Sequence, residues 1–253
     1  MNHTSPLQSH DPVWVRNADG VSSVVLVCEH ASRFIPDYFH DLGMSADDLA
    51  SHAVWDPGAA PVAAGISDAL DAPLVGAGIS RLVYDCNRPP SALDAMPEKS
   101  ERIIVPGNRG LTPTQRRART TEFYDPFRNG LASTIAGVKD PKIVTIHSFT
   151  PVYKGATRTV EIGILHDADQ RLADAMLHTA KSHTNFVVER NQPYGPQDGV
   201  THTLKEHALC HGHANVMIEI RNDLISTEAQ QTEVAKMLTG WLTDAVSQLE
   251  TMQ

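Results

Sequence analysis

Four short apolar runs of this chain each lead into polar or ionisable residues, and this pattern constrains the fold more than any other feature. With the polar residues that follow them, the runs occupy residues 24–30, 82–88, 143–149 and 216–221. Their β-branched content is typical of buried strands. In α/β folds such strand ends meet at one edge of a sheet, where ligands bind. The pattern therefore predicts an edge with two imidazoles, several carboxylates and an arginine, which indicates a metal hydrolase site.

Helical and strand-like segments alternate along the rest of the chain. Helices are expected over residues 45–50, 58–70, 112–138, 168–182, 203–210 and 227–249, and strands over residues 21–28, 72–78, 81–84, 101–105, 142–146, 159–165, 186–189 and 215–220. Pro126 should kink or split the longest central helix. This alternation predicts an α/β layer fold. Because strand follows strand between residues 72 and 105, we expect a mixed central sheet.

Composition limits the classes of protein that fit. The chain is long enough for one sizeable core, and no linker or repeat divides it, so residues 1–253 are expected to form a single domain with about residues 1–12 loose. The net charge of −9 argues against nucleic-acid and anionic-membrane binders, which need a basic face. No segment has the pattern of a membrane span or a signal peptide, so we expect a cytoplasmic protein.

Two histidines stand at the ends of apolar runs, His30 after the first and His147 after the third. Either could be an ordinary hydrogen-bonded histidine, but the shared strand-end setting favours a pair of metal ligands. A catalytic zinc site has three nitrogen or oxygen ligands and one open position. We expect Asp56 to be the third ligand, although its place before a helix also suits an N-cap. Glu29 is the alternative, and it needs a local bend because strand neighbours point to opposite faces.

Two further segments suit the chemistry of such a site. Glu219 lies in an otherwise apolar run, where an unpartnered carboxylate would be costly to bury. Near a metal it would serve as a general base, whereas on an edge strand it would only face water. Asn87 and Arg88 precede two prolines and are expected to hold a substrate carboxylate, because the planar arginine fork matches that group. A surface ion pair is the alternative for Arg88.

Seven short segments together resemble the N-formylglutamate amidohydrolase family. They are residues 28–32 (CEHAS), 55–59 (WDPGA), 80–90 (SRLVYDCNRPP), 146–151 (IHSFTP), 191–195 (NQPYG), 201–204 (THTL) and 218–223 (IEIRND). The resemblance extends from about residue 21 to past residue 223. Each motif alone is weak, and their number and order carry the resemblance. It implies a hydrolase that converts N-formylglutamate to formate and glutamate, in amino-acid catabolism.

A more distant resemblance, to the zinc carboxypeptidases, implies roles for individual residues. That family places a metal histidine early, an Asp-x-Asn-Arg substrate clamp next, a second metal histidine in a His-Ser-aromatic motif, and a catalytic glutamate late. This chain has His30, residues 85–88, His147 and Glu219 in the same order. The resemblance implies one Zn²⁺ per chain, with another divalent metal possible. It also implies a three-layer α/β/α fold with a mixed central sheet, of the zinc-carboxypeptidase-like (phosphorylase/hydrolase-like) kind.

The chain departs from that family at the second metal ligand. Carboxypeptidases carry His-x-x-Glu, whereas three residues beyond His30 this chain has Arg33. The carboxylate ligand must therefore come from elsewhere, so Asp56 and Glu29 both stay open at this point.

Three more residues complete the expected site. Arg158 and Arg221 are candidates for holding the side-chain carboxylate of glutamate, although either could be structural. His202 would polarise the carbonyl or steady the intermediate, although a histidine at a helix start is as often only solvated. The Gly- and Pro-rich loop over residues 191–201 would close over the substrate. The expected partner is a small N-acyl amino acid, and the oligomeric state is open.

Two other functions fit the same residues. One is a different metal amidohydrolase, either a deacylase for another N-acyl amino acid or a small-peptide carboxypeptidase. The other is a non-catalytic zinc or amino-acid binding protein, because a fold does not fix a function. A serine nucleophile is disfavoured because the chain has no Gly-x-Ser-x-Gly elbow.

Overall fold

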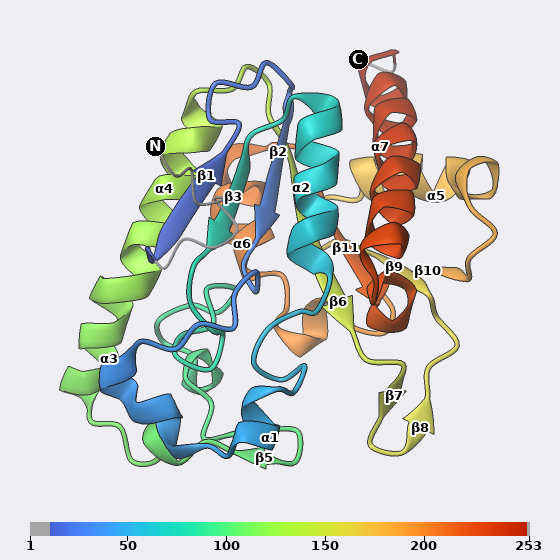
Figure 1. Cartoon of the computed structure of the whole chain (residues 1–253). Coiled ribbons are helices and arrows are strands. Elements are labelled where there is room, and N and C mark those ends of the chain that lie inside the picture. Colours follow the sequence, from blue (N-terminus) through green and yellow to red (C-terminus); the bar gives the residue numbers. More distant parts are fainter. Residues whose placement is uncertain (1–10, 252–253) are drawn as a thin grey trace, which may run out of the picture.

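A seven-stranded mixed sheet forms the centre of the computed structural model, which describes residues 11–251 (Figure 1). Its strand order is β1-β3-β2-β6-β11-β9-β10. In that order the strands are Val13–Arg16, Leu74–Ala77, Val24–Cys28, Lys142–Phe149, Asn215–Arg221, Ile162–Leu165 and Val188–Arg190. Strands β3, β2, β6 and β11 run parallel to one another, and β1, β9 and β10 run the opposite way. The predicted mixed sheet is confirmed.

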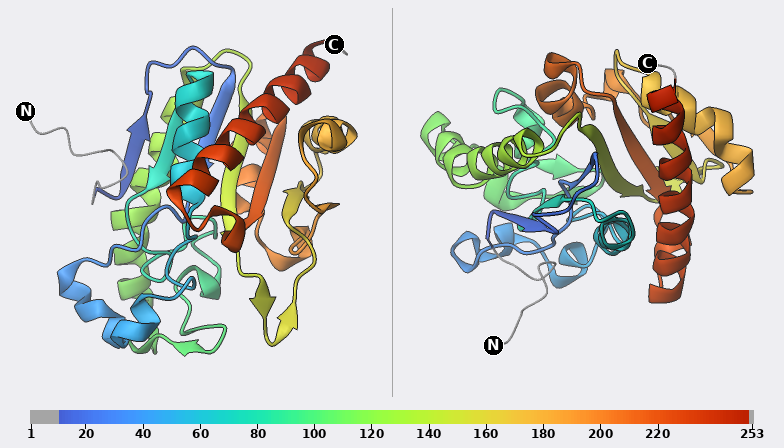
Figure 2. Two further views of the ribbon diagram at one scale, coloured as in Figure 1. Left: turned by 45° about the vertical axis from the view of Figure 1, so that its right-hand side comes forward. Right: turned by 90° about the horizontal axis from the view of Figure 1, so that it is seen from above.

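Helices cover both faces of this sheet, and Figure 2 shows the resulting three layers from two directions. One face is covered by α2 (Ala59–Leu70), α5 (Arg171–His183) and α7 (Glu228–Thr251), and the other by α4 (Asp125–Ala136) and α6 (His202–His207). The central strands are buried on both sides, which explains their unbroken apolar runs. The predicted three-layer α/β/α architecture is confirmed. Within residues 11–251, no helix is both long and apolar enough to cross a membrane.

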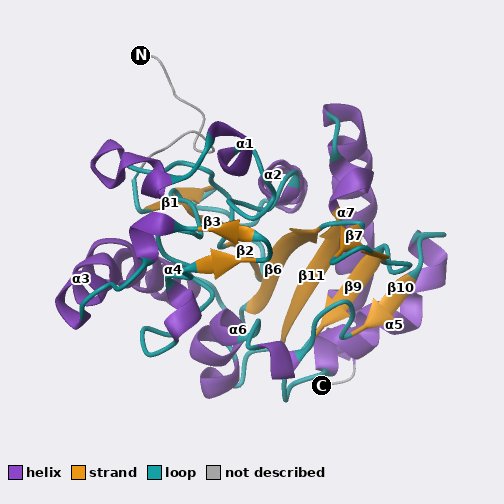
Figure 3. Ribbon diagram, turned by 90° about the horizontal axis from the view of Figure 1, so that it is seen from below, coloured by secondary structure: helices purple, strands orange, loops and turns teal. Residues whose placement is uncertain are grey.

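The carboxyl ends of the four parallel strands meet at one edge of the sheet, which Figure 3 views from below. Small elements gather beyond this edge (Figure 1). They are α1 (Ala46–Leu49), the β4–β5 pair (Lys99–Ser100 and Ile103–Ile104) and the β7–β8 hairpin (Val152–Tyr153 and Ala156–Thr157). Such an edge is where open α/β sheets bind their ligands.

The long central helix is split close to Pro126, as predicted. Its first part, α3 (Pro113–Arg119), begins with a capping box between Thr112 and Gln115. A π-helical turn, Thr120–Tyr124, follows, and α4 then begins with Pro126 in its first turn. The backbone stays helical throughout, so the π-helical turn interrupts the α-helical pattern directly before Pro126, whose missing amide removes one hydrogen bond of the helix.

The strand expected over residues 81–84 is wrong, because this segment forms turns. The amide of Val83 donates to the carbonyl of Ser80, which is the bond of a turn and not of a ladder. The side chains of Leu82, Val83 and Tyr84 are nevertheless buried. Their apolar character therefore reflects burial beneath the neighbouring loops, which a periodicity argument cannot distinguish from strand pairing.

The strands that make the sheet mixed also differ from those expected. The strand predicted over residues 101–105 is only the two-residue β5, which pairs with β4 apart from the main sheet. The antiparallel pairs of the main sheet are instead β9 with β11 and β1 with β3. β1 is a short edge strand missing from the prediction, and its Trp14 packs against the bare backbone of Gly76. The loose segment expected over about residues 1–12 falls largely on residues 1–10, which lie outside the described residues.

Candidate active site

Glu29, His147 and Glu219 lie at the carboxyl ends of the adjacent strands β2, β6 and β11, with Glu29 one residue beyond the end of β2. We expected His147 to follow directly after its strand. It instead lies inside β6, because β6 stays paired with β11 as far as Phe149. In that ladder His147 is opposite Glu219. On the other side β6 is parallel to β2. All three side chains are buried.

Three atoms from separate elements converge beside this row. Asp56 Oδ2 lies 3.3 Å from His30 Nδ1 and 2.9 Å from His147 Nδ1, and the two Nδ1 atoms are 3.2 Å apart. Ligand atoms that surround a tetrahedral zinc at 2.0–2.1 Å are about 3.3–3.4 Å from one another. The observed triangle has nearly this size, and its two imidazoles and one carboxylate are ligands that zinc accepts. His30, Asp56 and His147 could therefore hold a metal ion.

Carboxylates also stand at the far nitrogens of both imidazoles. Asp85 Oδ1 lies 2.7 Å from His30 Nε2, and Glu29 Oε2 lies 3.0 Å from His147 Nε2. An imidazole that donates from Nε2 presents a lone pair at Nδ1, which is the form that binds a metal. Glu29 does reach the site through a bend after Cys28, but it meets the nitrogen that points away from the cluster. The geometry favours Asp56 over Glu29 as the carboxylate ligand.

Asp56 does not have the structural role that its position suggested as an alternative. The N-cap of α2 is Gly58, and no side chain caps this helix. The carboxylate of Asp56 instead accepts hydrogen bonds from the Ser148 amide (3.2 Å) and from the Arg81 guanidinium (3.2 Å). Burial would raise the pKa of Asp56, but the positive charge of His30 and these neighbours hold it well below its usual range. The carboxylate is thus ionised and fixed in place.

Glu219 combines burial with an unused carboxylate oxygen. Its side chain is 5% exposed, and Oε2 has no hydrogen-bonding partner within residues 11–251. Burial raises the pKa of Glu219 to about 7, against the lowering effect of a positive charge on His147. A carboxylate with this pKa can accept and release a proton near neutral pH.

A cavity of about 360 Å³ opens over the cluster. Asn87 and Arg88 both line this cavity, but each side chain already makes hydrogen bonds within the protein. The Asn87 amide donates to the Val200 carbonyl (2.6 Å) and accepts from the Thr203 amide (3.0 Å), so it ties α6 to the site. Arg88 donates from Nε to Asp94 (2.9 Å) and from one terminal nitrogen to two backbone carbonyls. The other terminal nitrogen has no hydrogen bond among the described residues.

The two arginines expected near a second substrate carboxylate differ sharply. Arg221 is paired with Glu161 (3.3 Å) and Asp223 (2.8 Å) and does not line the cavity. Arg158 has no acidic partner among the described residues. It stacks against three aromatic rings, those of Phe149, Tyr153 and Tyr194, at 4.6–5.3 Å from their centroids, and all three rings line the cavity. Arg158 does not line the cavity itself, and it donates to the Thr150 carbonyl (3.2 Å) and the Tyr194 hydroxyl (3.0 Å), but its charge lies directly behind rings that do line it.

His202 does not reach the described cavity wall. It lies in the first turn of α6, where its Nε2 is 2.8 Å from the hydroxyl of Tyr124 and its ring stacks on that tyrosine. Burial lowers the pKa of His202, so the ring is neutral at physiological pH. Its expected role at the carbonyl stays a prediction.

Arg81 is the site residue that sequence reasoning missed. Its two terminal nitrogens bridge Asp56 and Asp85, at 3.2 Å and 3.1 Å. It therefore joins the carboxylate ligand to the carboxylate behind His30. Arg81 and Asp85 are four residues apart, a spacing that allows an ion pair within a helix. The strand predicted over residues 81–84 hid this pair, because residues four apart on a strand share a face but lie too far apart to touch.

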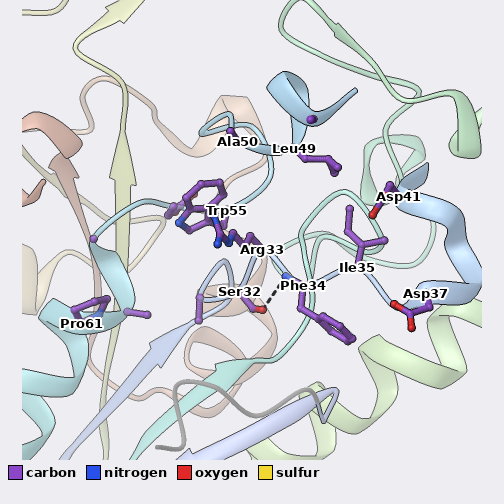
Figure 4. A pocket seen from close by; sticks show the side chains of 15 residues that line it. Ser32, Arg33, Phe34, Ile35, Asp37, Asp41, Leu49, Ala50, Trp55 and Pro61 are labelled. Carbon is purple, nitrogen blue, oxygen red and sulfur yellow. Dashed lines mark hydrogen bonds between the residues drawn. The ribbon is translucent and has the colours of Figure 1, made fainter. Parts of the chain in front are cut away.

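A second, larger hollow of about 960 Å³ lies beside the site, between the segment after β2 and the start of α2 (Figure 4). Its wall includes Ser32, Arg33, Trp55 and Pro61, and it shares Asp56 with the smaller cavity. The guanidinium of Arg33 lies 5.6 Å from the ring of Trp55 (Figure 4). Because Asp56 Oδ2 points to the two histidines, which line the smaller cavity, the possible metal ligands face that cavity.

Comparisons with known proteins agree with this arrangement. The structure of gene product Atu2144 from Agrobacterium tumefaciens is 53% identical, with a TM-score of 0.92 over 95% of this chain and 96% of that chain. N-formylglutamate amidohydrolase from Ralstonia eutropha JMP134 shares the fold, with a TM-score of 0.65 and 16% identity over 92% of this chain and 97% of that chain. No protein of curated function matches. Residues 22–226 match the family model of N-formylglutamate amidohydrolase. The chain therefore belongs to the N-formylglutamate amidohydrolase family.

Proposed function

We propose that this protein is a zinc-dependent amidohydrolase that cleaves the amide bond of N-formylglutamate and releases formate and glutamate. The observation that carries the proposal is the convergence of His30 Nδ1, Asp56 Oδ2 and His147 Nδ1 within 2.9–3.3 Å of one another, next to Glu219. Family membership supports the type of reaction. The likeness of the site to those of zinc carboxypeptidases, the cytoplasmic location and the absence of nucleic-acid partners stay predictions.

His30, Asp56 and His147 would hold the metal. When bound, zinc would lower the pKa of a water molecule and polarise the amide carbonyl. Proton transfer, substrate binding and the orientation of the ligands are assigned to side chains of the protein. Arg81 keeps Asp56 ionised and turned toward the histidines.

Glu219 is the proposed general base and acid. Its carboxylate takes a proton from the attacking water and later delivers it to the leaving amine of glutamate. Glu219 lines the cavity, which places its carboxyl beside a bound substrate, and its pKa of about 7 suits both directions of the transfer at neutral pH.

Arg88 and Arg158 are proposed to hold the two carboxylates of the substrate. Arg88 lines the cavity and keeps one terminal nitrogen free for the α-carboxylate, with Asn87 fixing the loop around it. Arg158 would bind the side-chain carboxylate, because Arg221 is already paired with two acidic side chains. Two fixed cations at a distance from the amide would orient the substrate for attack.

Formate release from N-formylglutamate, compared with a panel of other N-formyl and N-acetyl amino acids, tests this proposal. We expect kcat/KM to be highest for N-formylglutamate, since the 360 Å³ cavity suits a small substrate with two anionic groups. Selective cleavage of another N-acyl amino acid would keep the mechanism and change the substrate. Metal binding without turnover of any member would favour a binding protein and refute the enzymatic proposal.

A further inference from the structure

Glu29 is a buried carboxylate to which the proposed reaction gives no role. Its side chain is fully buried, and neither oxygen makes a hydrogen bond of ordinary geometry within residues 11–251. A carboxylate in that state is costly unless a nearby group compensates its charge. The nearest such group is His147, whose Nε2 lies 3.0 Å from Glu29 Oε2. His147 Nε2 also lacks a hydrogen bond of ordinary geometry among the described residues, and the side chain of Thr203 stabilises the Glu29 carboxylate as well.

The end of strand β2 brings these two residues together. In the parallel β2–β6 ladder, Val27 is opposite Thr145. β2 ends at Cys28, one residue before Glu29, whereas β6 continues to Phe149, so Glu29 meets His147 just beyond the end of this ladder. The contact therefore depends on where β2 ends and on the turn that follows it, which brings the Glu29 carboxylate to 3.0 Å from His147 Nε2.

We propose that Glu29 is a positioning residue that orients His147 for metal binding. Its carboxylate accepts the Nε2–H of His147, which fixes the tautomer with a lone pair on Nδ1. That lone pair then points at Asp56 Oδ2 (2.9 Å) and at His30 Nδ1 (3.2 Å). A carboxylate behind a histidine ligand also makes the imidazole a stronger donor to the metal. This inference rests on the proposed metal site and adds a residue to it.

Asp85 has the same relation to the other histidine. Its Oδ1 lies 2.7 Å from His30 Nε2. Each of the two imidazoles thus has a buried carboxylate at Nε2 and the cluster at Nδ1. Asp85 is additionally neutralised by Arg81 (3.1 Å), whereas Glu29 has no cation nearby other than the imidazoles. Within the proposed site, the Nε2–H of His147 is the donor that would compensate the buried carboxylate of Glu29.

The test compares Glu29→Gln with Glu219→Gln, two substitutions of the same size and chemistry on either side of His147. Zinc is titrated into each metal-free protein in competition with a chromophoric chelator. Glu29→Gln should weaken zinc binding by about 10- to 100-fold, which is the usual effect of losing such a partner. Glu219→Gln should bind zinc nearly as tightly as the wild type, because among the described residues Glu219 makes no hydrogen bond or ion pair with His30, Asp56 or His147.

Each outcome has a distinct meaning. If Glu29→Gln binds zinc as tightly as the wild type, the positioning role is refuted and the proposed function stands. If the wild type binds no zinc, the proposed metal function itself fails. Should Glu29→Gln not fold, nitrogen-15 NMR of zinc-loaded wild type labelled at histidine decides. A proton on Nε2 of His147 supports the proposal, and a proton on its Nδ1 overturns it.

Discussion

Replacing Glu219 by glutamine should have opposite effects on stability and on turnover. The carboxyl of Glu219 is buried, and its pKa rises from 4.5 to about 7. At about 1.4 kcal/mol for each tenfold step in proton affinity, this difference corresponds to about 3 kcal/mol of unfavourable free energy when the group is ionised. Glutamine has nearly the same shape without the charge, so metal-free Glu219→Gln protein should gain up to that amount at alkaline pH.

The sign of the pH dependence follows from linkage. Below pH 4.5 the carboxyl is protonated in both the folded and the unfolded protein, and the cost of burying a charge is absent. Above pH 7 it is ionised in both states, and folding carries the full cost. The stability that the protonated form gives is therefore lost as pH rises from about 4.5 to 7. The substitution should stabilise strongly at pH 8.5 and only weakly near pH 5.

Thermal unfolding of metal-free protein at these two pH values measures the first effect. For a domain of this size about 3 kcal/mol corresponds to roughly 6–12 °C in Tm, as an upper limit at pH 8.5. Formate release with zinc present measures the second effect, and kcat should fall about 10²- to 10⁴-fold, the usual contribution of a general base. Full activity in the variant, or a Tm difference that does not change with pH, would contradict this account of Glu219.

Three further predictions concern the metal, the substrate and the loop over the site. Removing the metal with a chelator should abolish formate release and lower Tm, since a ligand at 100 times its Kd contributes about 2.7 kcal/mol; unchanged activity and Tm would argue against a bound metal. Arg158→Gln should lower kcat/KM for N-formylglutamate by about 10- to 100-fold and spare N-formylalanine, whereas Arg221→Gln should keep the preference for glutamate; the reverse pattern would exchange their roles. Gly163→Ala should destabilise by about 1–3 kcal/mol in thermal unfolding, because a Cβ there would lie 2.0 Å from the carbonyl oxygen of Gln192. Gly240→Ala is its control, with nothing nearer than 3.8 Å to the added Cβ and no loss of stability expected.

The central strands could be predicted because burial on both faces leaves a direct mark in the sequence. Residues 24–28 and 215–221 have no water-facing side, so their apolar runs are continuous and easily recognised. The same signal misled at residues 81–84, where turns are buried beneath other loops. The edge strand β1 has only four residues and one fully buried side chain, Trp14, so it offers too little pattern to detect.

The site was predictable where a residue sits at a strand end, and less so where contacts depend on loops. His30 and His147 could be paired from their strands alone, and the structure brings them to 3.2 Å. The bridge that Arg81 makes between two carboxylates depends on the turn conformation of its segment, which no periodicity reveals. Likewise, only three-dimensional partners distinguish Arg158, which is free of acidic neighbours, from Arg221, which is not.

The central claim is that His30, Asp56 and His147 form a metal site. Anomalous diffraction at the zinc edge, from crystals of the protein grown with zinc, tests it most directly. We predict a single strong peak about 2.0–2.2 Å from Nδ1 of each histidine and from one carboxylate oxygen of Asp56. A peak coordinated by Glu29 in place of Asp56, or no peak at this edge of the sheet in zinc-saturated crystals, would contradict the account.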